Sequence, residues 1–81
     1  MARTAIVTGG SRGIGAAISK ARKAQGYNVA ATYAGNDEKA AAFTAETGIK
    51  TYKWDVGNYD ACKDGIAQVE ADLGPVEVLV N

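Results

Sequence analysis

The sequence contains no histidine, one cysteine and one proline among its 81 residues. A lone cysteine cannot form an internal disulfide, and without histidine a metal site would have to be built from carboxylates. The composition therefore favours neither a disulfide-stabilised secreted protein nor a metal-dependent one, and we expect no metal ligands. Cys62 is expected to be an inert helix residue, because nothing around it suggests an activated thiol.

Neither sign of charge is in excess, and long apolar runs are missing. Nine basic residues balance nine acidic ones, and no stretch concentrates lysine or arginine. This distribution argues against the basic surface that binds nucleic acids or anionic membranes. The segment before the first apolar run is too short for a signal-peptide core or a membrane span. We expect a small cytoplasmic protein of at most one domain, with a small molecule as its partner.

Glycine is plentiful, and the most informative glycines lie in residues 8–15, Thr-Gly-Gly-Ser-Arg-Gly-Ile-Gly. An apolar run at 5–7 precedes them, and a helical pattern follows. Such a turn directs backbone N–H groups and the positive end of a helix to one point, which suits a phosphate. We expect Gly9 to permit the tight turn, Gly13 to let the backbone approach a pyrophosphate, and Gly15 to let the helix pack closely.

The glycine spacing excludes two other phosphate-binding patterns. It is G-x-x-x-G-x-G, and the G-x-G-x-x-G pattern fails because Ile18 occupies its last position. A P-loop fails because Ala16 and Ala17 stand where a lysine and a serine or threonine are needed. An ordinary strand–turn–helix connection with flexible glycines and no ligand stays open as the simplest alternative.

Apolar periodicity and turn residues predict alternating strands and helices along the whole chain. Helices are expected at 13–25, from the cap Asn36 to Gly48, and from the cap Asn58 to Gly74; strands are expected at 4–8, 28–33, 49–54 and 76–80. The predicted fold class is α/β, a Rossmann-like βαβαβαβ unit with a parallel sheet in the order 3-2-1-4, lacking the second half of the full fold. A ligand is expected in the crevice at the carboxyl ends of the first and fourth strands, beside the glycine turn.

The first helix carries an apolar stripe that we expect to face the sheet, formed by Ile14, Ala17, Ile18 and Ala21. Arg22 and Gln25 extend the same stripe, where apolar side chains would be expected. Either that edge of the helix is in contact with water, or the chain has been altered there.

The segment after the second strand indicates which dinucleotide binds. An acid at that strand end would bind a free ribose 2′-hydroxyl and repel a 2′-phosphate. No acid occurs there before Asp37, whereas Arg12 lies in the glycine turn and Lys39 just beyond the strand. We therefore expect NADP(H) rather than NAD(H), with Arg12 and Tyr33 in the site. Solvated positions for both cations, and a plain strand-end aromatic at Tyr33, stay open as alternatives.

Two further strand ends carry candidate binding residues. Asp55 and Val56 follow the third strand, where a carboxylate and an apolar side chain could hold the adenine amino group and cover its ring. The alternative for Asp55 is a loop acid that caps the next helix. Asn81 ends the fourth strand beside the expected crevice and could position the backbone or the ribose.

Taken together, these residues resemble the short-chain dehydrogenase/reductase family, whose fingerprint T-G-x-x-x-G-x-G is matched by Thr8, Gly9, Gly13 and Gly15. The resemblance covers the whole chain and extends to residues 74–81, which are similar to the approach to the family's N-N-A-G motif. It is strongest to members that reduce acetoacetyl-CoA, followed by 3-oxoacyl-carrier-protein reductases.

The resemblance implies roles for individual residues. Ser11, Arg12 and Ile14 would contact the cofactor phosphates, Gly35 would lie near the 2′-phosphate, and Asp55 and Val56 would frame the adenine. Arg22 departs from the family pattern, which usually has an apolar residue there, and the N-N-A-G motif is cut after its first asparagine. The family's catalytic serine, tyrosine and lysine come later than Asn81.

Tyr59 and Lys63 have the Y-x-x-x-K spacing of a catalytic pair, but they open the third helix, directly after the adenine-side loop. We expect no catalytic role for them. Residues 1–81 are thus expected to form a dinucleotide-binding unit, a fragment of a longer single domain, that is inactive alone.

Two functions from different classes remain open. The chain is either the NADP(H)-binding N-terminal portion of an oxidoreductase that reduces a 3-oxoacyl thioester, or an engineered or truncated Rossmann half that only binds nucleotide or folds. A signalling domain of flavodoxin-like topology is disfavoured by the strand order and by the lack of an acidic cluster after the first strand. We also expect homo-oligomers, formed through the exposed edge of the fourth strand.

Overall fold

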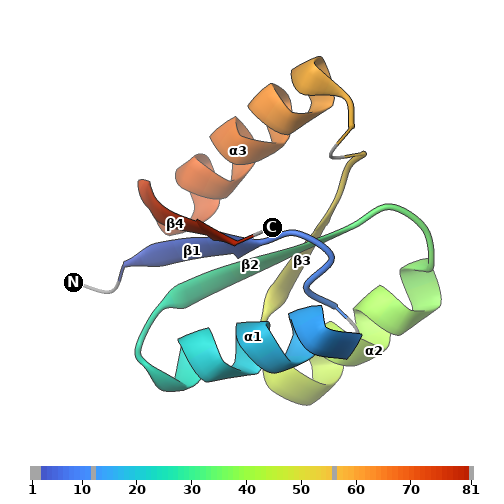
Figure 1. Cartoon of the computed structure of the whole chain (residues 1–81), viewed down its shortest axis with the longest axis vertical. Helices are drawn as coiled ribbons and strands as arrows, with labels where there is room; N and C mark the ends of the chain where they lie inside the picture. The colour runs from blue at the N-terminus through green and yellow to red at the C-terminus, as the bar shows by residue number, and fades with distance from the viewer. Residues whose placement is uncertain (1–2, 12, 56, 81) are drawn as a thin grey trace.

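The computed structural model describes residues 3–11, 13–55 and 57–80, so the predicted site residues Arg12, Val56 and Asn81 lie outside the described residues. Strands and helices alternate along the described chain as predicted (Figure 1). The predicted first and third strands and the first helix are each shorter in the structure. The elements are β1 (Thr4–Val7), α1 (Gly13–Ala24), β2 (Asn28–Tyr33), α2 (Asp37–Thr47), β3 (Lys50–Lys53), α3 (Tyr59–Leu73) and β4 (Val76–Val80).

The strands form one parallel sheet in the order β3-β2-β1-β4, which confirms the predicted topology. In its central part, Ile6 of β1 is paired with Ala30 of β2 and with Leu79 of β4. The strand order reverses at β1, because α1 leads away to β2 on one side and β4 lies on the other. The carboxyl ends of β1 and its neighbours are therefore where a ligand crevice belongs.

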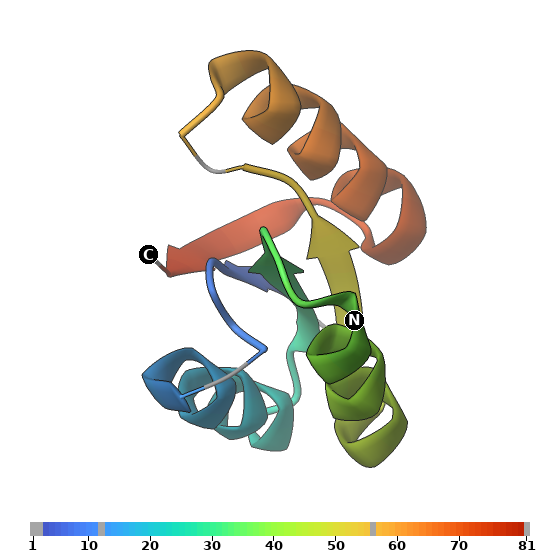
Figure 2. The ribbon, with the colours of Figure 1, turned by 90° about the vertical axis from the view of Figure 1, so that its right-hand side faces the viewer.

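Helices cover both faces of the sheet (Figure 2). On the face of α1 and α2, a buried cluster joins Val7, Val29 and Phe43. On the face of α3, Ile6 and Val69 form a second cluster, against which Trp54 and other partly buried side chains pack. The residues of β1 are buried throughout, as expected for the central strand of a sheet covered on both sides.

The predicted caps of α2 and α3 are confirmed. The side chains of Asn36 and Asn58 accept hydrogen bonds from backbone N–H groups in the first turns of these helices, each at 3.0 Å. Gly48 ends α2 with φ 74°, a left-handed conformation that favours glycine. Asparagine caps and a terminal glycine are local signals, so the sequence alone located these helix ends.

The predicted core-facing stripe of α1 is wrong in most of its members. Ile14 is 82% exposed and Ala17 and Ala21 are also exposed, whereas Ser19 is fully buried. The buried side is set by how closely the helix approaches the glycine turn. This contact favours small residues over the larger apolar ones that periodicity selects.

Arg22 stands half-buried on α1, at the position where the family pattern has an apolar residue. Its guanidinium lies over the ring of Tyr27, 5.5 Å from the centroid, and its Nη1 donates to Gln25 Oε1 at 3.2 Å. A guanidinium can stack on an aromatic face while its alkyl stem covers apolar surface. The side chains of Arg22 and Gln25 therefore bind each other at this edge of the helix.

A membrane-spanning helix is not found among the described residues, because none of their helices is both long and apolar enough.

Candidate functional site

The turn between β1 and α1 is held by hydrogen bonds to the strands on both sides. Thr8 donates from its backbone N–H to the carbonyl of Val80 at 2.8 Å, and its hydroxyl contacts the same carbonyl at 3.2 Å. On the other side, Gly9 N–H donates to the buried hydroxyl of Thr32 at 3.3 Å. These contacts fix where the turn leaves the sheet, so the backbone N–H groups that follow it are positioned before any ligand arrives.

The glycines of the turn have the conformations and contacts that their predicted roles require. Gly9 and Gly13 have φ values of 65° and 61°, in the left-handed region, and a Cβ at either position would meet nothing within 4 Å. A Cβ on Gly15, in contrast, would clash with the carbonyl group of Gly9. Gly15 thus permits close packing of α1 against the turn, while the backbone at Gly9 and Gly13 stays open to a ligand.

Ser19 is a structural residue of this site that sequence reasoning missed. Its hydroxyl oxygen lies 3.0 Å from the carbonyl oxygen of Gly10 and 2.9 Å from that of Gly15, and the hydroxyl donates to these two carbonyls. A Cβ on Gly10 would lie 2.6 Å from this oxygen. The sequence signal for this role was a serine among small residues, about one helical turn after the glycines. Only the fold shows that it points at the turn.

A pocket of about 310 Å³ opens where the β1–α1 turn meets the segment between β2 and α2. Figure 1 shows these two segments side by side at the carboxyl ends of β1 and β2. Four of the predicted site residues line it together. The lining residues are Gly9, Ser11, Tyr33, Ala34, Gly35, Asn36 and Lys39.

Among the described residues that line this pocket, Lys39 is charged and none carries a carboxylate. Asp37 lies next in the chain after Asn36, and its Oδ1 accepts the phenol hydrogen bond of Tyr33 at 3.0 Å. Lys53 contacts the same carboxylate, 3.3 Å from Oδ1 and 3.5 Å from Oδ2. The hydrogen bond to Asp37 is the main cause that raises the pKa of Tyr33 above its ordinary value. The contact with Asp37 therefore favours the protonated phenol over the phenolate.

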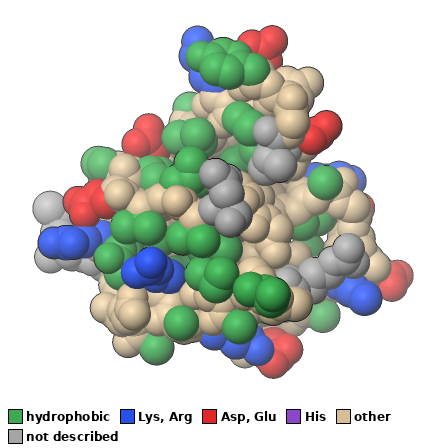
Figure 3. Space-filling model, viewed as in Figure 1, with side chains coloured by type: hydrophobic (Ala, Val, Ile, Leu, Met, Phe, Trp, Pro, Cys, Tyr) green, Lys and Arg blue, Asp and Glu red, His purple; other side chains and the backbone are tan. Residues whose placement is uncertain are grey.

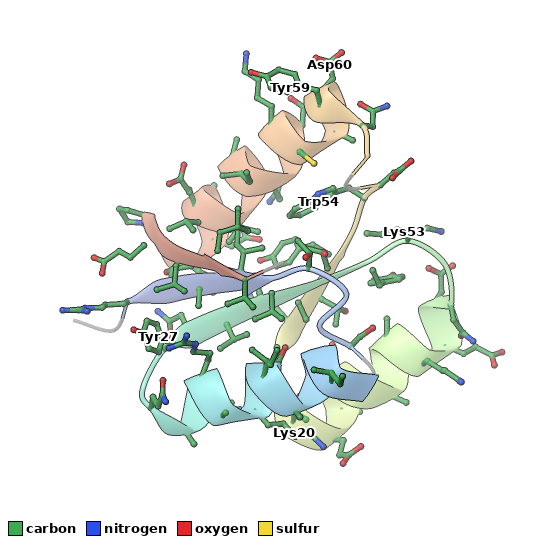
Figure 4. All side chains as sticks on the ribbon, viewed as in Figure 1. Lys20, Tyr27, Lys53, Trp54, Tyr59 and Asp60 are labelled. Atoms are coloured by element: carbon green, nitrogen blue, oxygen red, sulfur yellow. The ribbon has the colours of Figure 1, made fainter. Side chains whose placement is uncertain are left out.

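Lys53 was missed at the sequence level, although a signal for it exists. Tyr33 and Lys53 are register partners at the ends of β2 and β3. In a parallel sheet, residues that end adjacent strands lie at the same edge. Figure 4 shows Lys53 extending beside the segment that follows β2. Its pairing with Asp37 could have been expected from the predicted strand order.

Among the described residues, the predicted site residues Gly13, Ile14, Gly15 and Asp55 do not line this pocket. Gly13, Ile14 and Gly15 begin α1, directly beyond the turn. Asp55 lies after β3, where its Oδ1 accepts the N–H of Gly57 at 2.8 Å. This contact lies within the loop, and the cap of α3 is Asn58 rather than Asp55. Figure 4 shows Tyr59 at the first turn of α3, on the opposite side of the sheet from α1 and α2.

Comparison with known sequences finds one family. A model of the short chain dehydrogenase family matches residues 3–81. An acetoacetyl-CoA reductase from Paracoccus denitrificans is 73% identical over 81 residues, which is 100% of this chain and 34% of the relative. A 3-oxoacyl-[acyl-carrier-protein] reductase from Staphylococcus epidermidis is 41% identical over 86 residues, covering 100% of this chain and 35% of the relative. The chain spans about a third of the length of these relatives.

Solved structures show the same fold. A blue fluorescent protein from a metagenomic library, in complex with NADPH, superimposes with a TM-score of 0.85 at 36% identity, covering 95% of this chain and 34% of that one. A short-chain dehydrogenase/reductase variant from Serratia marcescens has a TM-score of 0.89 at 34% identity, covering 98% of this chain and 34% of that one.

The family match extends over nearly the whole chain and includes the glycine turn, whose T-G-x-x-x-G-x-G spacing carried the resemblance. The strand order β3-β2-β1-β4 and the open backbone at Gly9 and Gly13 agree with it. The chain belongs to the short chain dehydrogenase family.

Proposed function

We propose that this chain is the NADP(H)-binding N-terminal portion of an oxidoreductase that reduces a 3-oxoacyl thioester of the acetoacetyl-CoA type to the 3-hydroxyacyl thioester. The observation that carries the cofactor choice is the pocket beside Gly35, whose described lining residues include Lys39 and no carboxylate. The 73% identity to an acetoacetyl-CoA reductase supports the substrate class. A solved relative that is in complex with NADPH supports the cofactor.

The residues of the turn fit a dinucleotide. Open space at Gly9 and Gly13, just before and at the N-terminus of α1, suits a pyrophosphate, because the helix dipole favours an anion there. In this proposal Ser11, Arg12 and Ile14 contact the cofactor phosphates, with Arg12 reaching the 2′-phosphate, and Gly35 and Lys39 lie near the same 2′-phosphate.

The remaining predicted residues complete the proposed site. Tyr33 forms a wall of the ribose pocket, Asp55 and Val56 frame the adenine, and Asn81 lies beside the nicotinamide half. When bound, NADPH would supply the hydride that reduces the 3-oxo group. The chain's own residues would bind and orient the cofactor, and the proposal assigns no catalytic residue among them.

The proposal treats residues 1–81 as a dinucleotide-binding unit within a longer single domain, since the relatives are about three times as long. A single cysteine suits a reducing compartment, so we place the enzyme in the cytoplasm. We also infer homo-oligomers that form through the β4 edge of the sheet.

Cofactor titration of the Arg12→Ala variant tests the proposal. We expect the chain to bind NADPH more tightly than NADH. The substitution should weaken NADPH binding about tenfold and NADH binding much less, because a charge-assisted hydrogen bond to the 2′-phosphate is lost. Quenching of intrinsic fluorescence gives both dissociation constants.

Arg3→Ala provides a matched control for this titration. Arg3 is an exposed arginine that pairs with Glu77 beside the opposite end of the sheet, so its loss should change neither constant. Equal losses for NADPH and NADH in the Arg12 variant would remove the 2′-phosphate argument. Absence of binding to either cofactor would overturn the proposed function.

A further inference from the structure

The first acid after β2 is Asp37, one residue beyond the lining residue Asn36. A carboxylate that is free at this end of β2 would act against the proposed cofactor. It could accept a hydrogen bond from a ribose 2′-hydroxyl, and its charge would repel a 2′-phosphate. The charge state and orientation of Asp37 therefore bear directly on the cofactor choice.

In the structure the Asp37 carboxylate contacts two side chains, those of Tyr33 and Lys53. The phenol of Tyr33 donates to its Oδ1 at 3.0 Å, and the ammonium of Lys53 lies 3.3 Å from the same oxygen and 3.5 Å from Oδ2. Tyr33 lines the pocket, whereas Asp37 and Lys53 do not. Asp37 and Lys53 thus form an ion pair beside Tyr33, and among the described lining residues Lys39 is the charged one.

Lys53 reaches this position because of the parallel register. It ends β3 directly beside Tyr33, which ends β2, and α2 begins with Asp37 a few residues later. Three consecutive elements of the fold therefore meet at one carboxylate. Figure 4 shows the lysine extending along the connection between β2 and α2.

We propose that Lys53 is a specificity-determining positioning residue for the cofactor. By pairing with Asp37 it prevents this acid from selecting against a 2′-phosphate, and it keeps the carboxylate turned to the Tyr33 phenol. The role rests on the proposed function, because it presupposes that the pocket takes the adenosine ribose. Lys53 itself contacts no part of the cofactor in this assignment.

The test uses Lys53→Met in the full chain, with 2′,5′-ADP and 5′-AMP as probes that share the adenosine moiety and differ at the 2′-position. Binding of 2′,5′-ADP should weaken about threefold to fivefold, the range of an exposed ion pair, while 5′-AMP binding changes less than about twofold. The loss should shrink in about 1 M salt, where charges are screened over about 3 Å.

The chain offers a matched control in Lys20→Met. Lys20 pairs with Glu46 at 3.7 Å, and both lysine side chains are 52% exposed. Figure 4 shows the two lysines at opposite ends of α2. The Lys20 variant should bind both probes like the parent chain, so a loss shared by both variants would overturn the proposal.

A double variant, Asp37→Asn with Lys53→Met, separates positioning from direct contact. If Lys53 acts by neutralising Asp37, removing both charges restores 2′,5′-ADP binding to within about twofold of the parent. If the lysine attracts the phosphate directly, the double variant stays as weak as Lys53→Met, and the proposal is wrong. Circular dichroism spectra of the variants identify any loss that comes from unfolding.

The results also separate this inference from the proposed function. A parent chain that prefers 2′,5′-ADP, together with a Lys53→Met variant that keeps the full preference, overturns the role of Lys53 and leaves the function standing. A parent chain that does not distinguish the two probes overturns the NADP assignment, and the role of Lys53 with it.

Discussion

Gly65 shows at the scale of one residue how the core under α3 is built. Glycine in the middle of a helix costs about 1 kcal/mol relative to alanine. Here a Cβ would lie 2.5 Å from Cδ2 of Trp54, because the indole packs directly on the helix backbone. Glycine at this position lowers the helix propensity of α3, but it allows the ring of Trp54, just after β3, to pack against the helix.

We predict that Gly65→Ala destabilises the chain by about 1 to 2 kcal/mol, although alanine is the better helix former. The added methyl group must displace the Trp54 ring, and overpacking of this kind exceeds the propensity gain. Urea unfolding followed by circular dichroism measures the change.

The control is the Gly65→Ala substitution made in a Trp54→Leu background. Without the indole the methyl group meets open space, so Gly65→Ala should become neutral or stabilising there. An equal loss of stability in both backgrounds would show that the clash with Trp54 is not the cause.

At the scale of elements, Tyr52 and Asp72 join β3 to the last turn of α3. The phenol donates to Asp72 Oδ2 at 2.8 Å, and Gln68 Nε2 lies 3.3 Å from the same carboxylate. Burial, followed by this hydrogen bond and the charge of Asp72, raises the pKa of Tyr52 from 10.0 to about 12. The folded state therefore favours the neutral phenol more than the unfolded state does.

This shift predicts a loss of stability in alkali. Below pH 10.0 the phenol is protonated in both states, and the full contribution is present. Between pH 10.0 and about 12 the unfolded chain releases the proton first, so the free energy of unfolding falls as pH rises. Urea unfolding across this window should show a steeper fall for the parent than for Tyr52→Phe.

Tyr59→Phe serves as the comparison in that experiment, because Tyr59 is 81% exposed at the start of α3. It should keep the slope of the parent. A Tyr52→Phe variant with the same alkaline slope as the parent would contradict the linkage between Tyr52 and stability.

At the scale of the whole molecule, helices lie on both faces of the sheet, and β3 and β4 are its edge strands. Among the described strands β4 pairs only with β1, and its Leu79 is 53% exposed. Figure 3 shows hydrophobic side chains gathered in a band across the side of the molecule that carries β4 and α1. An apolar edge strand is a template for pairing with another chain.

We predict that this chain self-associates through β4, with a second copy as the partner. Sedimentation velocity should show a dimer fraction that grows with concentration, and Leu79→Lys should reduce it by placing a charge on the edge. Ala45→Lys, which adds the same charge on the exposed side of α2, should not. A strictly monomeric profile at high concentration would contradict the prediction.

Local signals were sufficient for most of the fold. Asn36 and Asn58 identify two helix starts, Gly48 and Gly74 identify the ends, and β1 is an apolar run buried on both faces. The strand order follows from alternating elements and right-handed crossovers. These features depend on residues close in the chain, so the sequence is enough to predict them.

For the candidate site, too, the sequence predicted some features and left others as predictions. The glycine spacing predicted the turn, and four of the predicted binding residues, Gly9, Ser11, Tyr33 and Gly35, line one pocket in the structure. Contacts with the cofactor stay predictions for all the assigned residues, and Arg12, Val56 and Asn81 lie outside the described part of the chain.

By itself, the sequence determined the α/β order, the phosphate-type turn and the family, because each follows from short-range patterns. Only the tertiary structure decided which side of α1 is buried, where Ser19 points, and that Lys53 neutralises Asp37. The Ser19 hydroxyl contacts the carbonyl oxygen of Gly10 across the β1–α1 turn, and Lys53 contacts the carboxylate of Asp37 from the neighbouring strand. Only the folded backbone brings these groups within hydrogen-bonding distance. Sequence periodicity predicts which residues share one face of a helix or strand. The contacts of Ser19 and Lys53 depend instead on the close approach of α1 to the turn and on the register of β2 with β3.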